Sequence, residues 1–259
     1  NNEASGVIAS DKTATYEILN YNHIPAVEHK IIFNPETRGN WAVKSIDEII
    51  KETKGKVVIK PNNGMEGFGV SICHNEVELK KQIEKLFLRK DALSISPYYE
   101  ILKEYRVYYL NESVYLIYEK ERPYIIGDGV STLNELINKK NLPIKKIVQE
   151  NLKLLDLESI PKKDEIVQLS WKFNLSGGAT SKVLEKNDFY KKLEDLALRA
   201  GHALNMKFAT IDIIEIIDHE ILVLEVNSGV SCEEFVKQNP LQYENVKNIY
   251  RNAINEMFR

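Results

Sequence analysis

The chain has 259 residues, of which 43% are hydrophobic, and its 35 basic and 38 acidic residues give a formal net charge of −3 at pH 7. This length and composition allow a buried core in one large domain or in two lobes. Basic and acidic residues are interspersed, so no basic stripe indicates a nucleic acid or a membrane surface as a partner. No apolar run reaches the roughly eighteen residues of a membrane span, and the first residues do not resemble a signal peptide.

The cysteines and histidines do not form a recognisable pattern. Cys73 and Cys232 lie far apart and outside any CxxC spacing, so the sequence predicts neither a disulfide framework nor a zinc site. The five histidines are scattered without a ligand spacing. A reducing, cytoplasmic setting fits this composition best.

The first half of the chain contains predicted helices and short strands. Asp11 is a suitable N-cap for a helix over residues 11–21. Further helices are predicted at 46–51 and 76–86, and strands at 30–33, 56–60 and 70–73. The segment 61–70 is the richest in glycine and lies between two of these strands, which predicts a loop.

The second half is richer in hairpins. Two β-rich runs within 105–118 are separated by the turn residues Asn111, Glu112 and Ser113. Helices are predicted from about Thr132, from about Lys145 and over 188–204, a strand at 166–169, and a strand pair at 208–214 and 221–227. This order of elements predicts an α+β fold with two lobes, 1–97 and 98–259, and a ligand cleft between them.

Three oxygen-bearing residues lie near the end of the chain. Glu225 and Asn227 are two apart and project from one face of a strand, and Asp212 lies on its hairpin partner. Solvent-exposed acids are the ordinary explanation for such a pair, but the neighbouring Val and Ile residues argue for burial. Buried carboxylates need a neutralising partner, and hard oxygen ligands of this kind suit Mg²⁺.

The glycine loop supplies a complementary feature. Gly64, Gly67 and Gly69 would let backbone N–H groups approach phosphate oxygens, and Lys60 directly precedes the loop. A plain turn is the alternative for such a loop taken alone.

Together these residues resemble the ATP-grasp superfamily over almost the whole chain. The resemblance lies in the order Asp11-Lys12, Val57-Val-Ile-Lys60-Pro61, Glu104-Tyr-Arg106, Asp212 and Glu225-Val-Asn227. The two lysines are 48 residues apart, and Asp212 and Glu225 are 13 apart, close to the spacings in the peptide ligases of that superfamily. Further segments are similar to cyanophycin synthetase and to the ATP-grasp half of bifunctional glutathione synthetase: Gly127-Asp128-Gly129, Thr132, Glu135-Leu-Ile137, Ile160-Pro161 and Asn174-Leu-Ser-Gly-Gly178. After the predicted helix that contains Glu135, those families carry an Arg-Gly pair and a His, which residues 142–146 replace here.

The resemblance implies a role for each matching position. Lys12 and Lys60 would reach the α- and β-phosphates of ATP, and Glu104 would accept hydrogen bonds from the ribose hydroxyls. Backbone at Tyr98, Tyr99 and Glu100 would meet adenine. Two Mg²⁺ ions, or Mn²⁺ in their place, would be held by Asp212, Glu225 and Asn227, with Glu225 bridging them.

Four further residues are candidates for catalysis or substrate binding. Arg106, Arg122 and Lys172 are the remaining cations on segments near the predicted cleft, and a guanidinium suits a carboxylate or a phosphoryl group. A surface salt bridge with Glu119, Glu121 or Glu104 explains each arginine equally well. Asn174 and the following turn would present amide donors to an acyl phosphate and an oxyanion.

The reaction implied is an ATP-dependent ligation. A substrate carboxylate attacks the γ-phosphate, and an amine then displaces phosphate from the acyl phosphate to form an amide. An ATP-grasp kinase and a non-catalytic nucleotide-binding module are the alternatives. The substrates would be an amino acid or a peptide. Lys12 lies near the start of a chain that does not begin with Met, so we expect either a longer protein, trimmed here, or a partner chain, including a homodimer, that supplies a substrate-binding domain.

Overall fold

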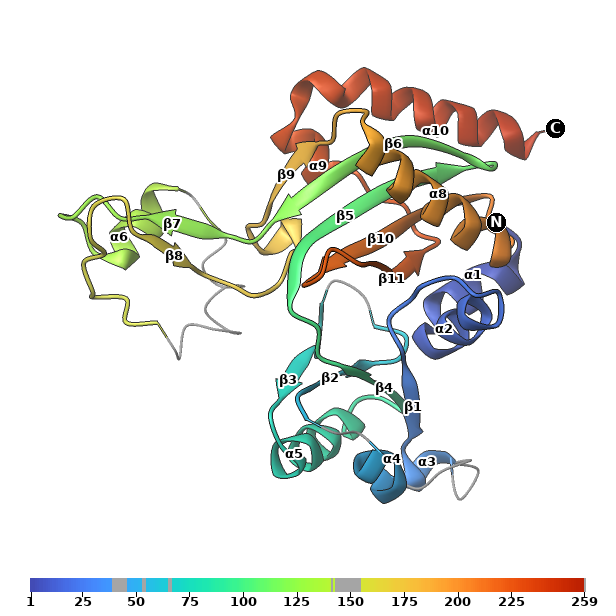
Figure 1. The fold of residues 1–259 in the computed structure, drawn as a ribbon, viewed down its shortest axis with the longest axis horizontal. Coiled ribbons are helices and arrows are strands. Elements are labelled where there is room, and N and C mark those ends of the chain that lie inside the picture. The colour runs from blue at the N-terminus through green and yellow to red at the C-terminus, as the bar shows by residue number, and fades with distance from the viewer. Residues whose placement is uncertain (39–45, 53–54, 65–66, 141, 143–154, 259) are drawn as a thin grey trace. The chain divides into compact units, whose positions relative to one another are not determined.

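The structure is a computed structural model that describes residues 1–38, 46–52, 55–64, 67–140, 142 and 155–258. The chain forms two compact units (Figure 1). The first contains residues 1–117, 185–230 and 253–259, and the second contains 118–184 and 231–252. These units divide the chain at other positions than the predicted lobes 1–97 and 98–259, which stay a prediction.

The first unit contains a four-stranded antiparallel sheet. Its strands are β1 (Lys30–Phe33), β4 (Ala92–Pro97), β2 (Val57–Pro61) and β3 (Ser71–Cys73), in the order β1-β4-β2-β3. Helix α5 (Glu76–Phe87), which the side chain of Asn75 caps, packs on β2, β3 and β4. The core between them is aliphatic, since Ile59, Leu79 and Leu93 are all buried. The short helices α3 (Pro35–Arg38) and α4 (Ile46–Glu52) complete this part.

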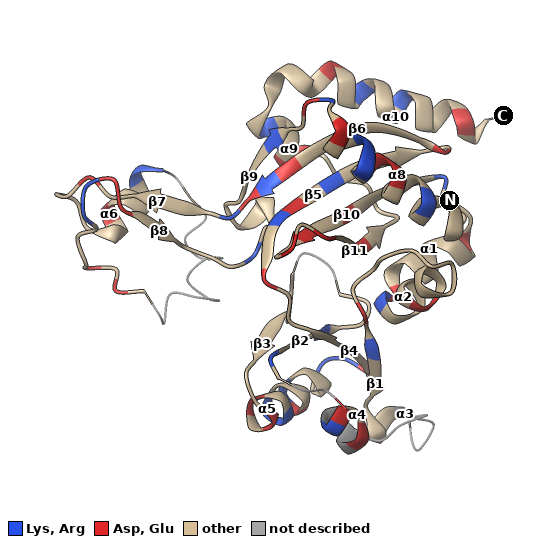
Figure 2. Ribbon diagram, viewed as in Figure 1, with Lys and Arg blue, Asp and Glu red and all other residues tan. Residues whose placement is uncertain are grey.

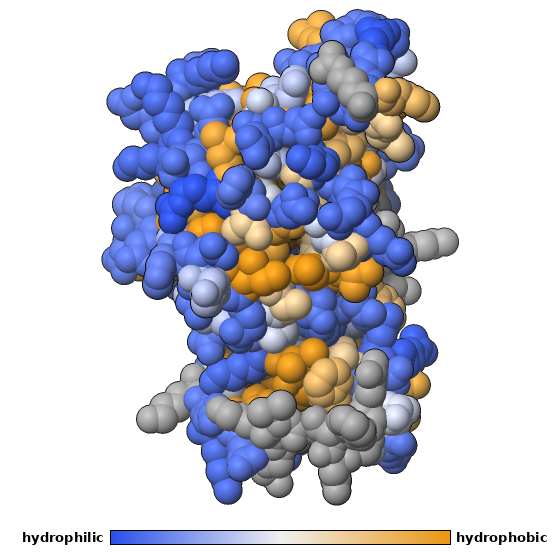
Figure 3. All heavy atoms as spheres, turned by 90° about the vertical axis from the view of Figure 1, so that its right-hand side faces the viewer, coloured by the Kyte–Doolittle hydropathy of each residue, from blue (hydrophilic) through white to orange (hydrophobic). Residues whose placement is uncertain are grey.

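A second set of strands in the first unit follows the order β11-β10-β5. These are β11 (Ile221–Asn227), β10 (Phe208–Ile216) and β5 (Ile101–Leu110), paired antiparallel. Helix α8 (Asp188–Ala203) packs on all three strands. Helices α1 (Glu3–Ser10) and α2 (Lys12–Tyr21) pack on each other and on β11. On the face that carries α1 and α2, hydrophobic side chains gather in patches bordered by hydrophilic ones (Figure 3).

The tight turns in this unit have backbone conformations that suit their polar residues. Asn111 and Glu112, between β5 and β6, have φ angles of 47° and 58°. Asp218 and His219, between β10 and β11, have φ angles of 64° and 58°. Two consecutive left-handed residues are typical of the hairpin turn whose twist matches that of its strands. Both predicted hairpins are therefore confirmed.

The second unit contains the strand pairs β6–β9 and β7–β8. Strand β6 (Ser113–Glu121) runs from the first unit into the second, where it pairs with β9 (Thr180–Val183). Strands β7 (Tyr124–Ile126) and β8 (Ile166–Gln168) cover α6 (Leu133–Lys139) through a core of buried aliphatic residues. The helix predicted from about Lys145 lies outside the described residues. The remaining elements are η2 (Leu175–Gly177), α9 (Glu233–Gln238), η3 (Pro240–Gln242) and α10 (Tyr243–Met257).

Charged residues and the two cysteines lie in several elements of the fold. Basic and acidic side chains lie on the same helices and strands (Figure 2). Both cysteines are free, and Cys73 is buried. Within the described part of the chain, we find no helix with the length and apolar character that a membrane span requires.

Candidate active site

Two buried lysines lie next to the glycine loop. Lys12 is the first residue of α2 and Lys60 lies in β2, and their exposed fractions are 9% and 7%. The Nζ atom of Lys12 donates to the carbonyl oxygen of Gly64 at 2.9 Å. Burial lowers the pKa of Lys12 and lowers the pKa of Lys60 to about 8, while the Glu225 carboxylate opposes both shifts. The two cations are therefore held where water stabilises them poorly, and an anionic ligand would neutralise them.

The glycine loop has the backbone conformation that its residues imply. Gly67 and Gly69 have φ angles of 69° and 71°, in the left-handed region that side chains disfavour. A Cβ atom at Gly69 would also lie 3.1 Å from the side chains of Leu86 and Pro61. Glycine is therefore required at position 69 for both conformation and space. Residues 65 and 66, in the middle of the loop, lie outside the described residues.

Five predicted site residues share one face of the β11-β10-β5 strands. Asp212 lies opposite Glu225 on β11 and opposite Arg106 on β5. The pairs Thr210–Asn227 and Ile214–Glu104 are two residues away along β10. Because side chains alternate between the faces of a strand, Glu104, Arg106, Asp212, Glu225 and Asn227 project from the same side.

Hydrogen bonds link the members of this row. The guanidinium of Arg106 donates to Asp212 through two bonds, Nε to Oδ1 at 2.8 Å and Nη2 to Oδ2 at 2.6 Å. The Nδ2 atom of Asn227 donates to Oε1 of Glu225 at 3.2 Å. Asp212 is only 1% exposed, and the bidentate pair gives its buried carboxylate a cationic partner. Asp212 is thus an acidic partner of Arg106 that the sequence did not suggest.

The donor set on this face fits a hard cation. Two carboxylates and a side-chain amide supply oxygen ligands of the kind that Mg²⁺ prefers. Among the described residues, no group of three or more His, Cys, Asp and Glu side chains could hold a metal ion. The predicted set has only two carboxylates, and its third member is an amide. Its role as a metal site stays a prediction.

The segment predicted to meet adenine joins β4 to β5. The backbone N–H of Tyr98 donates to the carbonyl of Lys56 at 3.0 Å, and the Lys56 ammonium lies 3.6 Å from the centre of the Tyr98 ring. Tyr99 is half-buried, which raises the pKa of its phenol, while Glu100 is exposed. Glu104, four residues further on, is buried, and its charge raises the pKa of Lys60. The predicted ribose ligand and the predicted phosphate ligand are therefore electrostatic neighbours.

Arg122, Lys172 and Asn174 belong to the second unit. The Arg122 guanidinium lies 4.6 Å from the centre of the Phe173 ring, and the Lys172 ammonium lies 5.7 Å from that of Trp171. Asn174 begins the turn η2, and its carbonyl accepts from Gly177 N at 2.9 Å. Lys172 and Asn174 flank Phe173, over whose ring Arg122 lies, but the roles of these three residues stay predictions.

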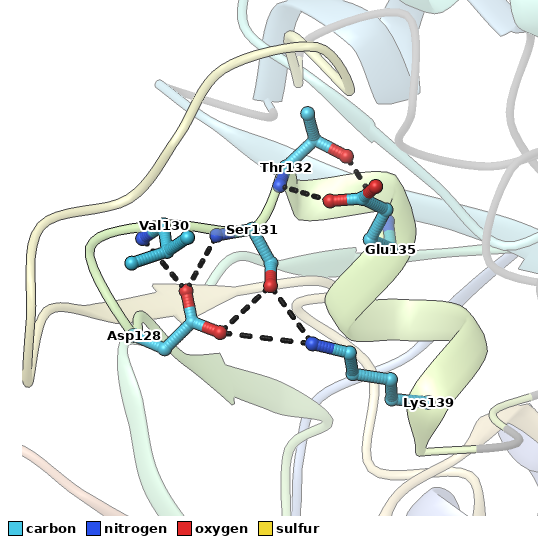
Figure 4. A network of polar contacts seen from close by, with 6 residues as sticks. All are labelled: Asp128, Val130, Ser131, Thr132, Glu135 and Lys139. Atoms are coloured by element: carbon cyan, nitrogen blue, oxygen red, sulfur yellow. Dashed lines mark hydrogen bonds and ion pairs between the residues drawn. The ribbon is translucent and has the colours of Figure 1, made fainter.

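The loop 127–131 in the same unit is a structural element. The Asp128 carboxylate accepts hydrogen bonds from Val130 N, Ser131 N and Ser131 Oγ, and Lys139 donates to the same hydroxyl at 2.8 Å (Figure 4). The bonds from Ser131 and Val130 lower the pKa of Asp128 to about 2. The next residue, Thr132, forms a capping box with Glu135 at the start of α6. The motif that we compared with two ligase families therefore fixes a loop and a helix start.

Two residues at the site were not identified from the sequence. His29 is 3% exposed, and its Nδ1 atom lies 2.9 Å from Ser94 Oγ. Its Nε2 atom makes no hydrogen bond of ordinary geometry among the described residues, although the backbone of Leu224 is near enough to raise its pKa. His29, Lys12 and Glu225 line the same small pocket.

Asn62, the other such residue, is 2% exposed and contacts the start of α2. The sequence indicated Asn62 only by its position at the start of a glycine loop. Nothing in the sequence indicated His29, because its burial results from contacts of the segment before β1 with β11 and β4.

Part of the chain matches a known domain family, and several known proteins are similar to it. Residues 168–245 match the family model of the RimK-like ATP-grasp domain. The bifunctional glutathione biosynthesis protein GshAB of Listeria monocytogenes is 31% identical over 209 residues, which cover 71% of this chain and 27% of that protein. GshAB of Clostridium perfringens is 28% identical over 251 residues, which cover 87% of this chain and 30% of that protein. The chain thus spans less than a third of the length of these relatives.

Solved structures show the same fold. D-alanine–D-alanine ligase from Bacillus anthracis has a TM-score of 0.64 at 17% identity, covering 98% of this chain and 70% of that one. A bifunctional glutathione synthetase from Pasteurella multocida has a TM-score of 0.56 at 21% identity, covering 97% of this chain and 38% of that one. These structures share an α+β ATP-grasp fold, so the predicted fold class and the resemblance seen in the sequence are both confirmed.

Proposed function

We propose that this chain, which has the ATP-grasp fold, is an ATP- and Mg²⁺-dependent ligase that joins a carboxylate to an amine. The observation that carries this proposal is the row of Glu104, Arg106, Asp212, Glu225 and Asn227 on one sheet face. Such a row combines the oxygen donors for metal ions with a cation for a transferring phosphoryl group. The names of the relatives, which concern glutathione and D-alanyl-D-alanine, favour an amino acid or a peptide as substrate.

The nucleotide would be held by residues of the first unit. Lys12 and Lys60 would contact its phosphates, and Gly64, Gly67 and Gly69 would let backbone N–H groups approach them. Glu104 would accept from the ribose, and the backbone at Tyr98, Tyr99 and Glu100 would contact adenine. Burial lowers the pKa values of the two ammonium groups, and a bound polyphosphate would stabilise their charged forms.

Asp212, Glu225 and Asn227 would hold two Mg²⁺ ions. The ions would neutralise phosphate charge during in-line transfer. Arg106 holds Asp212 in a fixed orientation through its two bonds and would orient that carboxylate toward the ions. Arg122, Lys172 and Asn174 would bind the substrate carboxylate and the oxyanion.

The proposed reaction has two steps. The substrate carboxylate attacks the γ-phosphorus, which releases ADP and leaves an acyl phosphate. The amine then attacks the acyl carbon, phosphate leaves, and the amine loses a proton as the amide forms. An acyl phosphate hydrolyses in water, so the enzyme must exclude water from this step.

The test measures the release of ADP from ATP in the presence of Mg²⁺ and a pool of amino acids and short peptides. Mass spectrometry identifies the products. We expect release only when an acid and an amine are both present, together with a product whose mass is their sum minus water. Glu225→Ala should reduce the rate by roughly a thousandfold, or ~4 kcal/mol, because a metal ligand is lost. Glu220→Ala, at an exposed position, is the matched control and should keep the parent rate.

Other outcomes would support other functions. Phosphate transfer to an alcohol without any need for an amine would indicate a kinase. ATP binding with no stimulation by any acid and amine pair would indicate a nucleotide-binding module.

A further inference from the structure

Asn62 connects the glycine loop to the first turn of α2. Its side-chain Oδ1 accepts from the backbone N–H and from the hydroxyl of Thr13, each at 3.2 Å. Its backbone carbonyl accepts from the N–H of Lys12 at 3.3 Å and lies 3.4 Å from the Lys12 ammonium. Because Asn62 is only 2% exposed, water does not compete for these bonds.

This arrangement caps a helix from a distant part of the chain. The first N–H groups of a helix lack partners within it, and a neighbouring residue usually supplies one. In α2, the side chain of Asp11 accepts a hydrogen bond from the N–H of Ala14. Asn62, 50 and 49 residues away, accepts from the N–H of Lys12 through its backbone carbonyl and from the N–H of Thr13 through its side chain. The helix start is therefore attached to the loop as well as capped.

The attachment also relates the two lysines of the site to each other. Lys60 lies two residues before Asn62, and the Lys12 ammonium donates to the carbonyl of Gly64, two residues after it. Both amines are buried, and the charge of Lys12 lowers the pKa of Lys60. Without a fixed anchor, mutual repulsion and the pull of solvent would move the flexible Lys12 side chain away.

We propose that Asn62 is a positioning residue that holds Lys12 against the glycine loop, and so fixes the separation of the Lys12 and Lys60 ammonium groups for a polyphosphate ligand. The attachment itself stands on the hydrogen bonds above, and only the identity of the ligand rests on the proposed function. A residue of this kind would act on nucleotide binding through Lys12, and not by touching the nucleotide.

The experiment compares Asn62→Ala with Asn20→Ala, which makes the same substitution at an exposed position of α2. The pH dependence of Lys12 acetylation is measured by peptide mass spectrometry in the absence of nucleotide. Asn62→Ala keeps the backbone carbonyl that Lys12 contacts and removes both Oδ1 bonds to Thr13, so it tests whether the side chain holds the first turn of α2 in place. We expect the midpoint of this dependence to rise in Asn62→Ala, because the released turn lets Lys12 become solvated and its pKa return toward the ordinary value, and to stay unchanged in Asn20→Ala. An unchanged midpoint in folded Asn62→Ala would overturn the proposal.

Nucleotide binding provides the second measurement. We expect Asn62→Ala to weaken the calorimetric Kd for Mg²⁺-ATP by about tenfold, the effect of roughly 1.4 kcal/mol from the lost hydrogen bonds, with the Asn20→Ala Kd unchanged. A shifted Lys12 midpoint with unchanged ATP affinity would overturn the positioning role. If the parent binds no ATP, the proposed function fails, while the acetylation result still decides whether Asn62 holds Lys12.

A second variant covers a failure of Asn62→Ala to fold. Thr13→Val removes only the hydroxyl bond to Oδ1 and leaves the bond from the backbone N–H. We expect a smaller rise in the Lys12 midpoint and a loss of ATP affinity of about threefold, in the same direction as for Asn62→Ala. No change in either quantity in folded Thr13→Val, when Asn62→Ala is unfolded, would count against the proposal.

Discussion

His29 is buried at 3% exposure and is a neutral imidazole in the folded protein. Burial, and then the charges of Lys60 and Lys12, place its pKa well below the ordinary value of 6.5. His29 is therefore protonated near pH 6.5 in the unfolded chain, but only at a lower pH in the folded chain. The free energy of unfolding contributed by this residue is fully present above pH 7 and is lost as the pH falls below the unfolded pKa.

We expect the parent to lose stability between pH 7.5 and 5.5 more steeply than His29→Gln, by up to about 1.4 kcal/mol per pH unit. Urea unfolding at the two pH values measures the difference. His23 is the control, because it is exposed and has a φ of 55°, which asparagine tolerates, so His23→Asn should follow the parent. Equal slopes for the parent and His29→Gln would contradict the neutral, buried state.

Lys60 leads to a prediction about nucleotide affinity. Burial lowers its pKa to about 8, so its positive charge disappears as the pH rises through about 8 in the free protein. Phosphates bind the charged form, and the affinity for Mg²⁺-ATP should therefore fall above this pH. Calorimetric titrations from pH 7 to 9.5 would show the decline.

The variant Lys60→Arg separates this residue from other titrating groups. A guanidinium stays protonated throughout this range, so the decline attributed to Lys60 should vanish, even if the affinity at pH 7 is lower. A decline that persists unchanged in Lys60→Arg would assign it to another group, with Lys12, whose pKa is also lowered by burial, as the nearest.

At the scale of elements, helix α8 packs closely on the strand that carries Arg106. A Cβ atom at Gly201 of α8 would lie 2.5 Å from the ring of Tyr109 on β5, and Tyr109 is only 1% exposed. Gly201→Ala should therefore destabilise the protein by about 1–3 kcal/mol through overpacking, despite the gain in helix propensity.

Thermal unfolding of Gly201→Ala measures this cost. The control is Gly229→Ala, because a Cβ atom at Gly229 meets no atom within 4 Å. Equal unfolding temperatures for the two variants would show that α8 moves away from β5 at little cost.

Hydrophobic patterns in the sequence predicted most of the elements around the site. The predicted strand at 30–33 and the predicted helix starting after Asp11 agree with the structure, since apolar spacing and a capping residue define them locally. Strand β4 was missed, because Ser94 and Ser96 interrupt its apolar run. Both serines are nonetheless buried, as β4 lies in the middle of its sheet. Helices α1, α9 and α10 were also not predicted.

The candidate site was predictable where residues lie on neighbouring strands. The tight turn brings β10 and β11 together, which the sequence predicts. A register shift between Asp212 and Ile213 then places Asp212 opposite Glu225, and the sequence does not indicate that shift. The bond between Arg106 and Asp212 and the attachment of Lys12 to Asn62 join segments far apart in the chain. Such contacts depend on tertiary packing, which no local pattern contains.

At the scale of the whole molecule, the candidate residues divide between the two units. Those proposed to bind the nucleotide and the metal ions, from Lys12 to Asn227, belong to the first unit, and Arg122, Lys172 and Asn174 belong to the second. Ligands that bind only the folded state stabilise the parts that contact them. Hydrogen exchange can therefore separate binding of the nucleotide from binding of the acid substrate.

We expect Mg²⁺-ATP alone to slow amide exchange in peptides around Lys60 and Gly64 and in β11, and to leave residues 171–178 nearly unchanged. Addition of the acid that stimulates ADP release should then slow exchange in 171–178, because Lys172 and Asn174 are proposed to bind it. Arg122→Ala, at another proposed ligand of the acid, should weaken only this second effect, and Arg251→Ala, at an exposed position of α10, should change neither. Protection of 171–178 by the nucleotide alone would show that the division of labour between the units is wrong, even if the ligase activity itself is confirmed.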